Sequence, residues 1–213
     1  MPMPTTPDVP RTRDPEKTRE RILGAAQALI LDHGYGATTV DAVVTRAGIT
    51  KGAFFHHFGS KSDLARALLD RYALMVAQHF ERNLERARKL STDPLQQLLI
   101  LIGLYEEEFE ALTEPFPGCL FAAYIYENKL FDGGTVGVLR EAALAWRQAM
   151  RAMLDKVIAA YPPRVEVDID SLADLFYALL EGSYIMTKTL GDRTLLARHA
   201  RHLRTYLELL FKP

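Results

Sequence analysis

Apolar positions recur every three to four residues along most of the chain, which is the spacing of one face of an α-helix. The first run begins after Asp14, a residue that can cap a helix, and Gly34 is placed to end it. Shorter runs over 40–47 and 51–57 follow, each preceded by a threonine, and Gly48 separates them. No segment alternates as a half-buried strand does, so the pattern predicts an all-α protein.

Longer helices are predicted for the rest of the chain, giving about nine helices in all. The fourth begins at Ser60 and the fifth at Asp93, because both residues are good helix caps. The remaining helices are expected near 119–130, 136–160, 169–190 and 192–211, with an irregular loop at 132–134 before the second of these.

The segment "KGAFFHHF", residues 51–58, places its rings on two faces when it is drawn as a helix. Phe54 and Phe58 lie one turn apart, and we expect them to pack into a core. Gly52, Ala53 and His56 lie on the opposite side, which is therefore small and polar. A helix with such an exposed face can enter the DNA major groove.

Local charge supports a nucleic-acid surface, although the whole chain does not. The chain has 26 basic and 27 acidic residues, so its net charge is −1. Between residues 42 and 62, however, Arg46, Lys51 and Lys61 are the only charged side chains. Thr39, Thr50 and Ser60 each lie at a predicted helix start, where free backbone amides attract phosphate.

Residues 19–69 resemble the N-terminal domain of TetR/AcrR transcriptional regulators, notably in "HGYGATTV", "RAGITKGAFFHHF" and "SKSDL". The resemblance implies a homodimeric repressor that binds a palindromic DNA operator. By matching position, it implies phosphate contacts for Thr39 and Lys61. It also implies a recognition helix that carries Thr50, Lys51, Gly52, Ala53, Phe55, His56 and His57. The family usually has tyrosine at position 55, so Phe55 offers DNA only an apolar contact.

Residues 1–13 are rich in proline and threonine and have little to bury, so we expect a disordered tail. The resemblance divides the rest into a helix-turn-helix domain (14–59) and a ligand-binding and dimerisation domain (60–213). Aromatic residues are frequent in the third part, where they can form either core or a small-molecule pocket. The candidate pocket residues are Tyr105, Phe109, Cys119, Tyr124, Trp146, Met150, Phe176, Glu181 and Tyr184. They suggest a small apolar or aromatic effector that releases the operator.

Cys119 leaves two alternatives open. It can be a buried structural residue, or it can sense electrophiles or oxidants, because a thiolate at a helix start has a lowered pKa.

The last two predicted helices carry apolar residues over wide faces, which favours contact with a second subunit. The expected interface residues are Leu172, Leu175, Leu179, Leu203, Tyr206, Leu207 and Leu210.

Composition excludes several other classes. One cysteine permits no internal disulfide, and residues 1–10 lack a signal-peptide pattern, so we expect a cytoplasmic protein. No apolar run is long enough to span a membrane. His199 and His202 supply too few ligands for a metal, and we expect neither metal nor cofactor. The rival hypothesis is an all-helical enzyme with an incidental three-helix head, but no catalytic constellation is recognisable in the sequence.

Overall fold

The computed structural model describes residues 14–131 and 133–212, and these form helices, turns and loops without a strand. The tail expected over residues 1–13 lies outside the described residues. The helices are α1 (Pro15–His33), α2 (Val40–Ala47), α3 (Lys51–His57), α4 (Lys61–Leu90), α5 (Pro94–Glu110), α6 (Leu120–Tyr126), α7 (Gly133–Ala160), α8 (Ile169–Leu190) and α9 (Leu195–Phe211), with a 3-10 turn at Asn128–Leu130. The predicted all-α fold is confirmed.

The predicted helix starts of the N-terminal part are confirmed in detail. The side-chain oxygens of Thr39, Thr50 and Ser60 each accept a hydrogen bond from the backbone amide three residues ahead, at 3.1–3.2 Å. Each bond satisfies one amide that the first turn of a helix leaves without a partner. The residues expected to form a loop at 133–134 instead belong to α7, which begins at Gly133.

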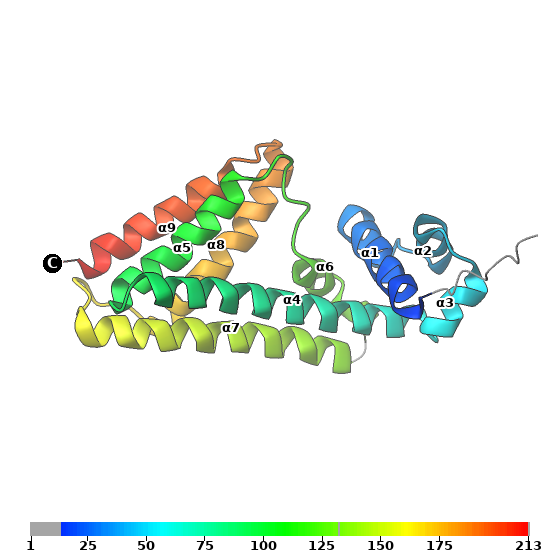
Figure 1. The fold of residues 1–213 in the computed structure, drawn as a ribbon, viewed down its shortest axis with the longest axis horizontal. Coiled ribbons are helices and arrows are strands. Elements are labelled where there is room, and N and C mark those ends of the chain that lie inside the picture. Colours follow the sequence, from blue (N-terminus) through cyan, green and yellow to red (C-terminus); the bar gives the residue numbers. More distant parts are fainter. Residues whose placement is uncertain (1–13, 132, 213) are drawn as a thin grey trace, which may run out of the picture.

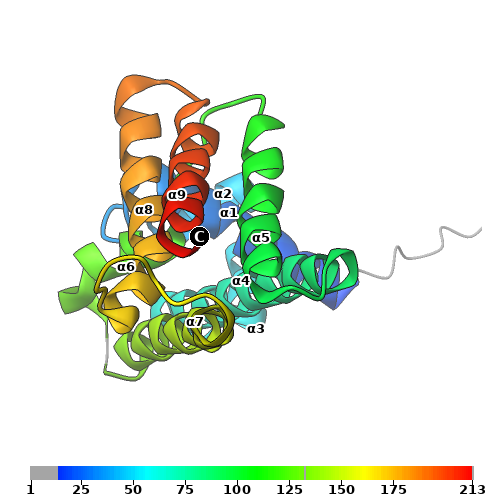
Figure 2. The ribbon, with the colours of Figure 1, turned by 90° about the vertical axis from the view of Figure 1, so that its left-hand side faces the viewer.

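The helices form a small head and a larger body (Figure 1). α1, α2 and α3 make up the head. In the body, the long helices α4 and α7 lie side by side, and α5, α8 and α9 rise from them as a bundle (Figure 2). α6 lies between the head and the bundle, and it contacts α1, α4 and α7.

Hydrophobic packing crosses the predicted boundary between residues 59 and 60. One apolar cluster joins the head to Leu64 and Leu68 of α4 and to Leu120 and Tyr124 of α6. A second cluster fills the bundle of α5, α8 and α9 and the adjoining parts of α4 and α7. The head is therefore packed directly on the start of α4 and on α6. Among the described residues, no helix is long and apolar enough to cross a membrane.

Candidate functional site

The short helix α3 is held to the head by its two buried rings. Phe54 is fully buried and Phe58 is nearly so, with their ring centroids 5.9 Å apart. The guanidinium of Arg19 lies 5.5 Å from the centre of the Phe58 ring, which adds a cation–π contact from α1. The two residues expected to form core do so, and this fixes which face of α3 is left outside.

The outer face of α3 carries small and polar groups. Gly52, Phe55 and His56 are exposed, whereas Ala53 and His57 are half-buried. A Cβ atom built on Gly52 meets nothing within 4 Å, so the backbone there is open to a close approach. Phe55 keeps 49% of its surface exposed, which is a large fraction for an aromatic side chain. This face has the shape that a groove-binding helix requires.

The turn between α2 and α3 depends on a glycine and an arginine. Gly48 has φ +61°, a left-handed conformation that glycine adopts without strain. The Arg21 guanidinium of α1 donates hydrogen bonds to the carbonyl oxygens of Ala47 and, at 3.1 Å, Gly48. A side chain at position 48 would also crowd this guanidinium, because a Cβ there lies 3.1 Å from Nη2. The sequence did not single out Arg21, which fixes α1 to this turn.

Acidic neighbours partly offset the basic window between residues 42 and 62. Lys51 Nζ lies 2.8 Å from a carboxylate oxygen of Asp41, and Arg46 pairs more loosely with Asp32 at 3.8 Å. All four side chains are substantially exposed. Exposed pairs of this kind contribute about 0–1 kcal/mol, so a phosphate can replace the carboxylate at little cost.

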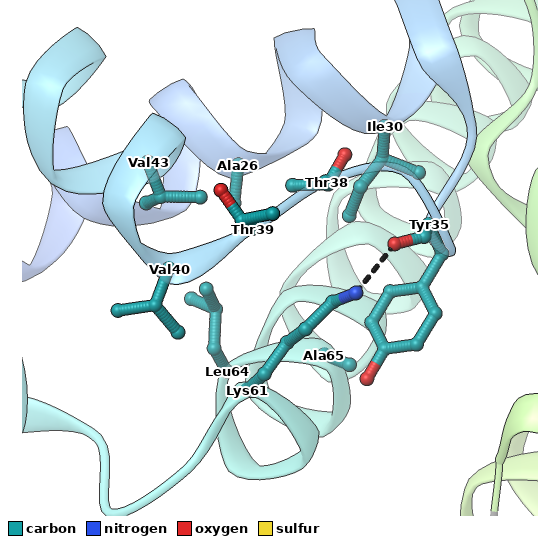
Figure 3. A pocket seen from close by; sticks show the side chains of 10 residues that line it. All are labelled: Ala26, Ile30, Tyr35, Thr38, Thr39, Val40, Val43, Lys61, Leu64 and Ala65. Carbon is teal, nitrogen blue, oxygen red and sulfur yellow. Dashed lines mark hydrogen bonds between the residues drawn. The ribbon is translucent and has the colours of Figure 1, made fainter.

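Lys61 has a different position from the one that a simple phosphate contact suggests. Figure 3 shows its side chain reaching toward the α1–α2 turn, where Nζ donates to the Tyr35 carbonyl oxygen at 2.6 Å. The ammonium group also lies 4.0 Å from the centre of the Tyr35 ring. Burial lowers the pKa of Lys61, and the nearby carboxylate of Glu127 opposes that shift. In this conformation Lys61 holds the turn, and its expected contact with phosphate remains a prediction.

Glu127, just after α6, binds the α1–α2 turn from the other side. Its two carboxylate oxygens accept hydrogen bonds from the backbone amides of Tyr35 at 2.8 Å and Gly36 at 2.7 Å. Gly34 has φ +83°, and a Cβ there would lie 2.5 Å from a Glu127 oxygen. A Cβ on Gly36 would lie 2.9 Å from the other oxygen. The "HGYG" spacing thus leaves room for a carboxylate that the sequence analysis missed.

A second long-range contact joins the body to the head. Lys188, near the end of α8, donates from Nζ to the carbonyl oxygen of Leu31 in α1 at 3.0 Å. The last turn of a helix leaves its carbonyl groups without internal partners, and a lysine is a suitable donor to them. α8 therefore binds the end of α1, and the residue that follows α6 binds the turn after it.

The body contains a cavity of about 1100 Å³ with walls from α4, α5, α6, α7 and α8. Its walls are mostly apolar and aromatic, as expected for a small-molecule site. Six of the nine predicted pocket residues line it: Tyr105, Phe109, Cys119, Trp146, Glu181 and Tyr184.

Three predicted pocket residues are core instead, which corrects the expectation. Met150 and Phe176 are buried in the bundle cluster and do not line the cavity. Tyr124 is fully buried in the head cluster, where it stacks on Phe131 and donates to the Ala65 carbonyl oxygen at 3.1 Å. Aromatic residues at helical spacing have the same pattern in a core and in a cavity wall, so the sequence could not separate the two.

Polar groups gather at one end of the cavity. The Glu181 carboxyl interacts with the Cys119 thiol and the Tyr177 hydroxyl, and the Tyr72 hydroxyl lies 3.9 Å from the Cys119 sulfur. Burial raises the pKa of Glu181 above its usual value. Tyr72 and Tyr177 also have raised pKa values, mainly because they are buried, and stay neutral.

The Cys119 thiol is not activated by its position before α6. Burial, assisted by the negative charge of Glu181, raises its pKa to about 12. The expected lowering at a helix start is therefore overturned by desolvation and a neighbouring acid, and the thiol is protonated at neutral pH. This environment favours the structural alternative for Cys119 over the sensing one.

The surface expected for a second subunit needs correction at four positions. Leu172, Leu203, Leu207 and Leu210 are at most 6% exposed and belong to the bundle cluster of their own chain. α9 uses its leucine face to pack on α5, so that face is not available to a partner. Leu175 and Leu179 are half-buried and Tyr206 is 41% exposed. The large apolar side chains that α8 and α9 expose are Ile185, Met186, Leu190, Tyr206 and Leu209.

His199 and His202 have different surroundings. His199 Nδ1 lies 2.8 Å from the Ser183 hydroxyl, and His202 is exposed. In the two described stretches, no group of three or more His, Cys, Asp or Glu side chains is arranged to hold a metal ion.

Two family models match the chain. Residues 22–68 match the model of bacterial regulatory proteins of the tetR family. Residues 94–203 match the model of the tetracyclin repressor-like C-terminal domain. Together they cover most of the head, the start of α4, and the body from α5 into α9.

Curated relatives point the same way. The transcriptional repressor AcnR of Corynebacterium glutamicum is 35% identical over 170 residues, which cover 79% of this chain and 80% of that protein. The regulator AcuR of Cereibacter sphaeroides is 28% identical over 87% of this chain and 85% of its own length. The repressor KstR2 of Mycolicibacterium smegmatis is 32% identical, but the match spans 51% of this chain and 47% of that repressor.

Solved structures share the whole fold. A TetR transcriptional regulator from Chloroflexus aurantiacus superposes with a TM-score of 0.76 at 27% identity, over 94% of this chain and 98% of its own. A TetR-family regulator from Agrobacterium tumefaciens gives a TM-score of 0.74 at 26% identity, over 93% and 100%.

Proposed function

The chain belongs to the TetR family of bacterial transcriptional regulators, and from that premise we propose that it is a repressor that binds a palindromic operator as a homodimer. We further propose that a small apolar or aromatic effector in the cavity of the body releases the DNA. The relatives AcnR and KstR2 are named as repressors, which supports the direction of control.

The outer face of α3 is the single observation that carries the DNA-binding proposal. Gly52 leaves the backbone open, Phe55 is an exposed ring, and His56 is the polar group at the centre of the face. Gly and Ala let the helix sit deep in a groove, His56 can donate to a base edge, and Phe55 can contact a thymine methyl group. Thr39, Thr50 and Lys51 lie at helix starts around this face, where they can contact phosphate.

A homodimer through α8 and α9 is supported by their exposed apolar side chains. Ile185, Met186 and Leu209 are each at least 44% exposed on a single chain, although they lie on helices that are otherwise well packed. A two-fold dimer would bury this surface and would present two copies of α3 to two half-sites of the operator.

The proposed effector response uses α6 and α8, because both helices touch the cavity and the head. α6 contributes Phe121 and Ile125 to the cavity wall, and Glu127 directly after it binds the α1–α2 turn. α8 contributes Glu181 to the wall and Lys188 to α1. An effector that moves either helix changes the position of the head, and typical coupling energies of about 1–3 kcal/mol suffice to lower operator affinity several-fold.

Selection of bound sequences from random duplex DNA tests the DNA-binding and dimer proposals together. We expect an inverted repeat whose affinity falls steeply with salt, measured by fluorescence anisotropy, and expression from a reporter downstream of it that falls when the protein is present. Failure to enrich any sequence would contradict sequence-specific DNA binding. Enrichment of a single half-site bound by one chain would contradict the dimer.

A Cys119 sensor remains the alternative for the release step, because the thiol lines the cavity. An electrophile would then lower operator affinity in the native protein but not in Cys119→Ser. The pKa of about 12 weighs against this alternative. An all-helical enzyme is the more distant rival, and the matched relatives are transcriptional regulators.

A further inference from the structure

Glu181 is a half-buried acidic residue in the wall of the cavity. Within residues 14–131 and 133–212 it forms no ion pair, and its side-chain contacts are the Cys119 thiol and the Tyr177 hydroxyl. Both contacts are neutral donors, because burial raises the pKa of each. A carboxylate that is half-buried and has only neutral neighbours is costly in an apolar site, and the cavity leaves that cost uncompensated.

Other charged groups on the cavity wall differ from Glu181. Arg88 is paired with Glu81 at 3.1 Å, and His79 is paired with Glu108 at 2.8 Å. The remaining charged wall residues, Arg82, Glu141 and Lys156, are exposed at the surface. Among the described residues of the wall, Glu181 is therefore the charged group that is half-buried and has no ion pair.

Aromatic rings surround the same end of the cavity. Tyr184 stacks on Phe116 with centroids 4.5 Å apart, Tyr72 meets Phe121 edge to face at 4.9 Å, and Trp146 lies 6.3 Å from Tyr177. These six rings come from four helices and one loop, and all of them line the cavity together with Glu181. Aromatic faces attract cations, and the attraction is stronger when water is excluded.

We propose that the cavity selects effectors that carry a positively charged amine on an apolar or aromatic body, with the amine bound by Glu181 and by the neighbouring tyrosine rings. This inference rests on the proposed function of the cavity and narrows its ligand class. The ammonium group of the ligand supplies a positive charge next to Glu181, which has no ion pair among the described residues. The apolar remainder fills the walls formed by α4, α5 and α7. An anionic ligand would instead bring a second negative charge to the same end.

Three probes with one skeleton test the charge preference: 4-phenylbutylamine, 4-phenylbutanol and 4-phenylbutyrate. Trp146 is the only tryptophan of the chain and lines the cavity, so its fluorescence reports binding directly. We expect the amine to bind about ten- to one-hundredfold more tightly than the alcohol, as hydrogen bonds to charged groups predict. The butyrate should bind most weakly.

Glu181→Gln assigns the preference to one side chain. Glutamine has nearly the same shape and keeps a hydrogen-bond acceptor, but it carries no charge. In this variant the amine should lose its advantage over the alcohol, while alcohol affinity stays within about twofold of the native value, since a twofold change is only about 0.4 kcal/mol. Glu85→Gln, an exposed residue of α4 outside the cavity, removes the same charge and should keep the advantage.

The outcomes separate this inference from the proposed function. Operator binding by the native protein and by Glu181→Gln, measured on the same samples, shows that both are folded and that DNA binding stands by itself. Equal affinity for amine and alcohol overturns the amine assignment and leaves an effector cavity in place. Three other results also overturn the amine assignment. They are a preference for the amine that persists in Glu181→Gln, tighter binding of the butyrate than of the amine, and no binding of any of the three probes.

Discussion

His56 and His57 are adjacent on α3, but their surroundings differ. His56 is exposed at the centre of the outer face, whereas His57 is half-buried, with its ring 5.3 Å from that of His56. We expect His56→Ala to relax the preference for one base pair in each half-site by about 1–3 kcal/mol and to change binding to random duplex little.

His57→Ala is the matched comparison, and it should weaken binding to specific and random duplexes alike. A panel of operators with single base substitutions, measured with both variants, gives the answer. If His57→Ala changed base preference and His56→Ala did not, the roles assigned to the two imidazoles would be reversed.

The buried thiol gives a second prediction at the residue scale, which concerns pH. A pKa of about 12 means that folding favours the protonated thiol, so alkylation of Cys119 by iodoacetamide should be very slow at pH 7. The rate should rise with pH up to about 12, whereas in protein unfolded by urea it should level off soon above 9.0, the ordinary pKa of a cysteine thiol. Because folding holds the thiol protonated, its contribution to stability is complete below pH 9 and declines as pH rises toward 12. Rapid alkylation of the folded protein at pH 7 would restore the sensing alternative.

Among the elements, α6 carries the most direct consequence, because the residue after its last turn holds the head. Glu127→Ala leaves the Tyr35 and Gly36 amides without their carboxylate, and we expect a loss of about 1–3 kcal/mol in the free energy of unfolding. Operator affinity should fall as well, since the α1–α2 turn loses its fixed position. Denaturation by urea and anisotropy on operator DNA measure the two effects.

Two further variants control for this effect. Glu127→Gln keeps one acceptor oxygen and should lose less than Glu127→Ala. Glu166→Ala removes an exposed acid from the loop before α8, and it should change neither quantity appreciably. A Glu127→Ala protein with native stability and native operator affinity would show that the contact with the turn is dispensable.

Local signals explain why the helix starts were predictable and the contacts between helices were not. Thr39, Thr50 and Ser60 cap helices through bonds that span three residues, so short sequence motifs are sufficient to locate them. Glu127 binds amides 91 and 92 residues away, and nothing near it in the sequence marks that partner. The outer face of α3 was predictable because Phe54 and Phe58 mark the buried face of the helix, and the outer face lies opposite them.

The leucine face of α9 shows what helical periodicity cannot predict at the level of the whole molecule. Its spacing predicts a buried face correctly, but periodicity does not tell whether the covering surface is α5 of the same chain or a second subunit. Leu203 and Leu207 are covered by their own chain. Periodicity also does not tell which aromatic residues line the cavity. Tyr124 and Tyr184 are both tyrosines on predicted helices, yet of these two only Tyr184 lines the cavity.

For the whole molecule, the exposed apolar residues of α8 and α9 predict how to separate the proposed dimer. Ile185→Glu combined with Leu209→Glu should give a monomer in sedimentation velocity with an unchanged helical spectrum, because both side chains are more than half exposed on the single chain. Burying either charge in an interface would be costly. Leu90→Glu, at an exposed apolar residue at the end of α4, should remain dimeric.

Leu203→Ala is the contrasting variant, because we expect it to lower the stability of the single chain and not to act through the dimer interface. A cavity in the bundle core should cost about 2–5 kcal/mol in the free energy of unfolding. A native-like dimer from the Ile185→Glu and Leu209→Glu double variant would place the subunit interface on another surface.

The apolar cluster that continues from the head into α4 and α6 has a consequence for the construction of hybrid regulators. A hybrid joined at residue 60 would give the head of this protein a foreign start of α4 and a foreign α6, in place of Leu64, Leu68, Tyr124 and Glu127. Such a hybrid should be poorly folded or unresponsive unless those positions travel with the head. The transplantable unit is therefore a discontinuous one, made of α1–α3, the first turns of α4, and the segment from Leu120 to Phe131.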